Sequence, residues 1–282
     1  MFLVVSVLSA VLYGWSDYMG GRAARQMPAL RVTLIMEFMM IVAYAIAVLV
    51  DPAPMSSNAM LWGALAGAGG TLGVTAFYAA LASGSMSIAS PVTGTTSAVI
   101  PVIVGLLLGE RPGALAITGI VLAVGSVALI SGGGGSGSRV APRQLLLALA
   151  AGGSFGLWFI GLERAGDDSG WWPLFAARLL ALPCVLTVYL VLRKRGFDPV
   201  GLRGSEGARW ALGAGIMVLA ANIAYLIAVR EGMLTVTAAI VSLYPASTIA
   251  LALTIDRERL ARLQALGIAL ALGALVLVGL GT

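Results

Sequence analysis

The sequence predicts an all-α polytopic membrane protein in which ten transmembrane helices form an inverted repeat of two five-helix halves. Three observations lead to this fold class. The 282 residues are 60% apolar and only 10% charged, with a mean hydropathy of +1.00, which is far outside the range of soluble proteins. The chain contains ten apolar runs, and its second half repeats a pattern of the first at a fixed spacing.

The apolar runs have the lengths that membrane spans need, because about 20 apolar residues in a helix cover a hydrocarbon core of roughly 30 Å. In chain order they are Phe2–Tyr18, Leu30–Val50, Leu61–Ala82, Ile88–Leu108, Leu115–Ile130, Leu145–Leu162, Pro173–Leu192, Ala211–Val229, Val236–Thr254 and Leu263–Leu280. Glycines in the third run, at 63, 67, 69, 70 and 73, are expected to let helices pack closely.

The repeat is clearest in Ser87–Arg111, which returns 148 positions later as Thr235–Arg259. Between 110 and 130 nine of 21 positions are identical to their counterparts, without a gap. We divide the chain into a first repeat (1–131), a Gly/Ser-rich linker (132–143) and a second repeat (144–282). Five helices per half make the second half enter the membrane from the opposite side, so Glu110 and Glu258 are expected on opposite faces.

The composition removes several kinds of chemistry. Histidine is absent and the only cysteine lies in an apolar run, so we expect no catalytic residues, no metal site, no cofactor and no disulfide framework. The net charge of +5 comes from arginines in the loops, which does not indicate nucleic-acid binding. The expected partners are a small-molecule substrate and the lipid bilayer, with the chain a monomer or, alternatively, a dimer.

The basic residues predict the orientation in the membrane. Thirteen of the seventeen Lys and Arg residues fall on the side reached after the first run, and three on the other. Because basic loops stay in the cytoplasm, both termini are expected outside it, in the inner membrane of a bacterium. Trp171 and Trp172 are then expected at the outer interface.

Two polar residues inside apolar runs are candidates for function, since such groups usually face a cavity or each other. Glu37 could accept a coupling proton or bind a cationic group; alternatively it pairs with Arg31 or Arg178, or reaches toward an interface. Asn222 could hold a substrate carboxylate or amine, or it could bond a neighbouring helix.

Aromatic residues predict the wall of a solute cavity, through apolar contact and attraction for cations. The candidates are Trp15, Tyr78, Trp158, Tyr225 and Tyr244. Packing between helices is the alternative for each of them.

The fourth and ninth runs combine hydroxyls with prolines, which free backbone carbonyls inside the membrane. The hydroxyls Thr93, Ser97 and Ser242 are candidate substrate ligands. The prolines Pro91, Pro101 and Pro245 are candidate hinges. A hydroxyl that only bonds its own helix is the alternative.

The sequence resembles the drug/metabolite transporter superfamily, in particular its ten-helix branch with two EamA-type repeats. The resemblance rests on Tyr13-Gly14-Trp15 and its echo Phe155-Gly156-Leu157-Trp158, on Arg31 and Arg178, and on Gly-Glu-Arg and Arg-Glu-Arg after the fourth and ninth runs. It implies export or exchange of amino acids, nucleosides, sugars or drugs, and the aromatic amino-acid exporters of the YddG type look most similar. Many members of this branch have cytoplasmic termini, whereas the charge count here predicts the reverse.

The leading hypothesis is therefore a secondary transporter that works by alternating access. An intramembrane enzyme acting on lipid-linked substrates is a distant alternative, because no two intramembrane acids stand at helical spacing. An ion channel would need a repeated filter or a charged ring, and the sequence has neither.

Overall fold

The computed structural model describes residues 2–107, 113–132, 140–166, 169–194, 205–231, 241, 244–257, 260 and 262–281. Within these ranges the chain is helical and contains no strand. The helices are α1 (Phe2–Gln26), α2 (Ala29–Val50), α3 (Ser57–Ala82), α4 (Met86–Leu107), α5 (Ala114–Gly132), α6 (Pro142–Arg164), α7 (Trp172–Lys194), α8 (Ser205–Glu231), α10 (Tyr244–Thr254) and α11 (Arg262–Gly281).

Six of these helices are long and apolar enough to cross a membrane. They are α1, α2, α3, α7 and the greater parts of α6 and α8. The all-helical, polytopic membrane class is thereby supported, whereas the total of ten spans stays a prediction.

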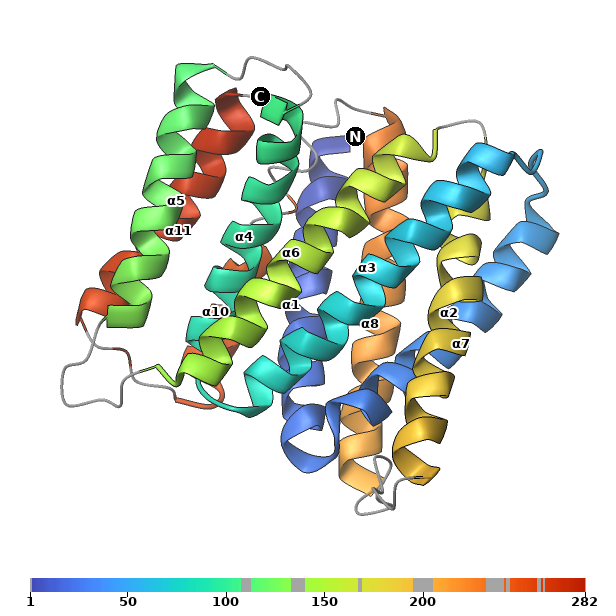
Figure 1. The fold of residues 1–282 in the computed structure, drawn as a ribbon, viewed down its shortest axis with the longest axis horizontal. Helices are drawn as coiled ribbons and strands as arrows, with labels where there is room; N and C mark the ends of the chain where they lie inside the picture. The colour runs from blue at the N-terminus through green and yellow to red at the C-terminus, as the bar shows by residue number, and fades with distance from the viewer. Residues whose placement is uncertain are drawn as a thin grey trace.

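The helices pack in a pattern that crosses between the two halves of the chain. α1 packs against α8 and α3 packs against α6, so the first and third helices of one half meet the third and first of the other. The last helices of the halves, α5 and α11, form a pair at one side of the bundle, and the two termini lie at the same end (Figure 1).

Glycines bring α3 against its neighbours, as the sequence predicts. A Cβ on Gly67 would lie 2.1 Å from the carbonyl oxygen of Ala177, and one on Gly63 would lie 2.4 Å from that of Pro173. Both contacts are with the backbone of α7, which cannot move aside locally. The prediction of close helix packing is confirmed, because small residues allow backbones to approach in this way.

Polar contacts fasten the two ends of the bundle. At one end Arg22 and Arg25 of α1 both reach Asp256, just after α10, at 2.8 and 3.4 Å. At the other end Trp171 donates to Asp51 at 3.0 Å and Trp172 to the carbonyl of Ala53 at 2.9 Å. The two indoles thus hold the connection between α2 and α3, a role that the sequence did not indicate.

Candidate functional site

A cavity lies between helices of both halves; its empty space of about 660 Å³ includes a part that is open to solvent. The first half contributes residues of α1, α2 and α3, and the second contributes residues of α6, α7, α8 and α10. Its walls are largely apolar and aromatic, with a few charged and polar groups, as is usual for ligand sites. The lining residues are Tyr13, Ser16, Asp17, Met36, Glu37, Met40, Gly70, Val74, Tyr78, Phe155, Trp158, Phe159, Arg178, Val218, Asn222 and Tyr244.

A buried ion pair joins α2 to α7 at this cavity. Nη1 of Arg178 donates to both carboxylate oxygens of Glu37, at 2.8 and 2.9 Å, and the hydroxyl of Thr71 donates to the same carboxylate at 3.0 Å. Only 4% of the Arg178 side chain and 1% of the Glu37 side chain are exposed. The pair therefore neutralises two charges that would each be costly to bury alone.

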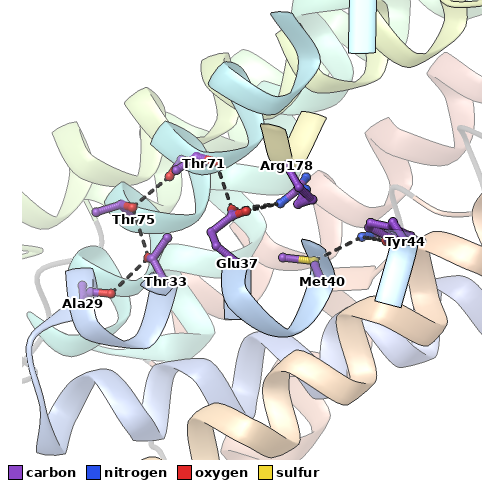
Figure 2. Close-up of polar contacts among 9 residues, drawn as sticks. Ala29, Thr33, Glu37, Met40, Tyr44, Thr71, Thr75 and Arg178 are labelled. Atoms are coloured by element: carbon purple, nitrogen blue, oxygen red, sulfur yellow. Dashed lines mark hydrogen bonds and ion pairs between the residues drawn. The ribbon is translucent and has the colours of Figure 1, made fainter. Parts of the chain in front are cut away.

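Figure 2 shows how Glu37 points toward Thr71 and Arg178, while threonine hydroxyls continue the polar contacts between α2 and α3. The hydroxyl oxygens of Thr33 and Thr75 lie 3.1 Å apart, and each hydroxyl also donates to the carbonyl four residues earlier in its own helix. These contacts fix the position of α2 along the axis of α3, and with it the position of the Glu37 carboxylate.

Arg178 also touches the aromatic wall of the cavity. Its guanidinium carbon lies 5.1 Å from the centre of the Trp158 ring, a cation–π distance. Its Nε is buried without a hydrogen-bond partner among the described residues. Trp158 is thus already engaged by a cation of the protein itself.

Asn222 links three helices, α1, α2 and α8, at the same cavity. Its amide nitrogen donates to the hydroxyl of Tyr44 at 2.9 Å, and its amide oxygen accepts from the hydroxyl of Tyr13. The sulfur of Met40 lies 3.8 Å from the same nitrogen. Asn222 therefore lines the cavity and bonds neighbouring helices, as one of the two alternatives expected; a role in holding a substrate stays a prediction.

Asp17 is a charged cavity residue that the sequence did not single out. The first apolar run was ended at Tyr18, which placed Asp17 at its edge, but α1 continues to Gln26 and carries Asp17 inside the bundle. Only 8% of Asp17 is exposed, and its Oδ2 has no hydrogen-bond partner in the part of the chain described. In the sequence Asp17 stands between Ser16 and the small residues Gly20 and Gly21, a pattern that is compatible with a helix face turned toward other helices.

The structure brings together about half of the residues predicted for the site. Tyr78, Trp158, Asn222 and Tyr244 line the cavity, and so does the coupling candidate Glu37. These five come from five different helices, α3, α6, α8, α10 and α2. Their convergence is a property of the fold, since nothing in their spacing along the chain indicates it.

The remaining predicted substrate ligands lie elsewhere. Trp15 is 42% exposed on the outer face of α1, and Tyr225 is buried against Phe159, with ring centres 5.9 Å apart. Thr93 donates to the carbonyl of Ala148 in α6, and Ser97 to that of Gly94 in its own helix. None of these four is among the cavity-lining residues, and Ser242 is outside the described residues.

The candidate hinge prolines occupy different positions in their helices. α4 runs as one helix from Met86 to Leu107 through both Pro91 and Pro101. Pro245 lies in α10, which the structure describes from Tyr244 onward. A Cβ on Gly94 would lie 2.5 Å from Cγ of Pro245, so α4 and α10 touch there. A hinge function of the prolines stays a prediction.

Within the described residues no cluster of three or more acidic or cysteine side chains could hold a metal ion. The polar groups of the cavity instead offer one ion pair, one unpaired carboxylate and several hydroxyls around an aromatic space. This arrangement suits the reversible binding of a small amphipathic solute.

Comparison with known proteins defines the class to which this fold and cavity belong. The sequence matches the EamA-like transporter family twice, over residues 1–132 and 142–280, and the chain belongs to this family of membrane transporters. A solved structure titled "Crystal structure of protein" has the same fold, with a TM-score of 0.63 and 17% identity over 96% of this chain and 94% of that one. The comparison with curated proteins finds no match.

The family points to a transporter of small molecules in the membrane rather than to an enzyme. Its two matches also agree with the internal repeat seen in the sequence.

Proposed function

We propose that the chain is a secondary transporter that moves small amphipathic metabolites across the bacterial inner membrane by alternating access, with amino acids of aromatic or other apolar side chains as the first class to test. The observation that carries the proposal is the cavity itself. Both halves contribute to it, and such sites at repeat interfaces bind the solute in many transporters.

The helix packing supports an inverted repeat of two five-helix halves with ten spans. A two-fold axis between the halves would turn the contact of α1 with α8 into the contact of α6 with α3. It would also pair the last helix of each half, α5 and α11, with each other, and this is the packing observed. The termini at one end of the bundle agree with an even number of spans. With the basic residues facing the cytoplasm, we place both termini outside it.

The lining supports an amphipathic substrate. Tyr13, Tyr78, Phe155, Trp158, Phe159 and Tyr244 give it six aromatic rings. An aromatic amino acid would place its ring among these rings and its charged groups near the acidic and basic side chains, as expected for a YddG-type exporter. Organic cations such as cationic drugs are the second candidate, because the cavity holds two acids and one base; nucleosides and sugars follow.

The proposal is tested by truncating two aromatic side chains of the cavity, one from α3 and one from α6. Tyr78→Ala and Trp158→Ala should each lower exchange of labelled phenylalanine or phenethylamine in proteoliposomes by about tenfold, because each loses ring contacts with the solute. Phe38→Ala is the matched control, since Phe38 is 64% exposed on the outside of α2. Unchanged exchange in both cavity variants, with folded protein, would remove the cavity from the transport path.

A further inference from the structure

We propose that Asp17 is the anchor for a positively charged amine: the cavity holds an ammonium group against its carboxylate, and this group rather than a carboxylate is what the site requires of its substrate. The inference rests on the proposed function and specifies its substrate class.

Asp17 has no structural partner that would explain its burial. Its Oδ2 is inaccessible to solvent and has no hydrogen-bond partner within the described ranges, although the residue is more than nine-tenths buried and lines the cavity. An unpaired carboxylate inside a protein is costly, and buried polar groups are otherwise almost always satisfied. The Asp17 carboxyl group stabilises nothing in the empty cavity, and a ligand that brings a positive charge to it would explain its presence there.

The other charges around the cavity are already paired. Arg178 is bound to Glu37 through two hydrogen bonds. On α1, Arg22 is bound to Asp256 beyond the end of the cavity. Of the three acidic or basic residues that line the cavity, Asp17, Glu37 and Arg178, the last two neutralise each other, and one acidic group is left without a counter-charge among these lining residues.

The remaining surroundings of Asp17 also suit an ammonium group. The hydroxyls of Tyr78 and Tyr244 line the same cavity; in the described part of the chain neither makes a hydrogen bond of normal geometry, and the side chains of Ser16 and Ser97 lie beside them. Hydroxyl oxygens accept hydrogen bonds from ammonium protons, and tyrosine rings attract cations. A ligand carboxylate would instead add a second acidic group beside Asp17; the Arg178 guanidinium has an Nε that is unpartnered among the residues described, but its charge is already neutralised by Glu37.

Three matched ligands separate the two charged groups of an amino acid. Phenylalanine carries both charges, phenethylamine only the ammonium group, and 3-phenylpropionate only the carboxylate. We expect the purified wild-type protein to bind the first two by calorimetry and to bind 3-phenylpropionate at least tenfold more weakly. In Asp17→Asn the dissociation constants of the two amines should rise at least tenfold.

The melting temperature of the D17N protein shows whether Asp17 has a binding role or a structural role. Asn has nearly the volume of Asp but no charge, so the melting temperature of the empty D17N protein should equal or exceed that of the wild type. The control Glu231→Gln removes one acidic charge from the exposed end of α8 and should change neither binding nor stability. Should D17N be destabilised, Asp17→Glu, which retains the charge, decides between the roles: amine binding by the folded Asp17→Glu protein supports the anchor, and its loss would indicate a structural role and overturn the inference.

The outcomes distinguish the inference from the function on which it rests. Equal amine binding by D17N and wild type, or preferred binding of 3-phenylpropionate, would overturn the ammonium anchor and leave transport through the cavity standing. Failure of the folded wild type to bind or exchange any of the three ligands would contradict the proposed function and the inference together.

Discussion

At the scale of single residues, the charges of the cavity divide into a pair that stabilises the fold and a carboxylate that does not. Glu37 and Arg178 tie α2 to α7, and Thr71 of α3 bonds the same carboxylate. Removing one member of a buried pair leaves its partner uncompensated, which costs more than removing both.

We therefore expect Glu37→Gln to lower the free energy of unfolding by on the order of 3–5 kcal/mol, and Glu37→Gln combined with Arg178→Gln to recover at least half of that loss. Thermal unfolding in detergent measures both effects. Additive losses in the double variant would show that the pair contributes no coupling.

The same Glu37→Gln variant tests the coupling role predicted from the sequence. If Glu37 carries the coupling proton, the pH dependence of exchange disappears in this variant at equal amounts of folded protein. A pH profile like that of the wild type would assign Glu37 to structure alone.

The sequence predicts only some of the residues that line the cavity. Glu37 and Asn222 stood out because polar groups are rare in apolar runs, and both line the cavity. Trp15 was misleading, because an aromatic residue beside glycine looks the same whether its helix face meets the cavity or, as here, the outside. Only the rotation of α1, set by its packing on α8 and α10, separates Trp15 from its neighbours Ser16 and Asp17.

At the scale of helices, the contacts of α3 depend on its glycines. α3 crosses α7 with backbone against backbone at Gly63 and Gly67, and it meets the side chains of Trp158 and Phe155 at Gly70 and Gly73. The same helix therefore fastens the bundle and sets two aromatic residues of the cavity wall.

We expect Gly67→Ala to lower the melting temperature by several degrees, because the added methyl group would lie 2.1 Å from the backbone oxygen of Ala177 and would force α3 away from α7. Gly125→Ala is the matched control: a Cβ there meets nothing within 4 Å, and alanine favours a helix over glycine by about 1 kcal/mol. Equal stability of the two variants, measured by thermal unfolding in detergent, would contradict the account of this contact.

The helices themselves were largely predictable, and their ends were not. Each of the first eight apolar runs corresponds to one described helix, because apolar length is a direct consequence of the membrane. α1 continues well past Tyr18, through Gly20 and Gly21, to Arg22 and Arg25, and Arg22 is held there by Asp256, just after α10. The missed extension is what concealed Asp17.

At the scale of the whole molecule, the duplicated sequence and the crossed packing of α1 with α8 and α3 with α6 belong together. The repeat is visible in the sequence, because identical residues recur at a constant spacing of 148 positions. The meeting of seven helices around one cavity was not, because contacts between the halves leave no periodic signal in either of them.

The central claim is that this cavity is exposed alternately to the two faces of the membrane. The test is a single cysteine at Val74, which lines the cavity, in a variant whose exposed native Cys184 is replaced by serine. A membrane-impermeant thiol reagent is added from outside to sealed vesicles of right-side-out and of inside-out orientation. We predict labelling from both faces, slowed by a transported amine; labelling from one face alone under all conditions, or from neither, would contradict alternating access through this cavity.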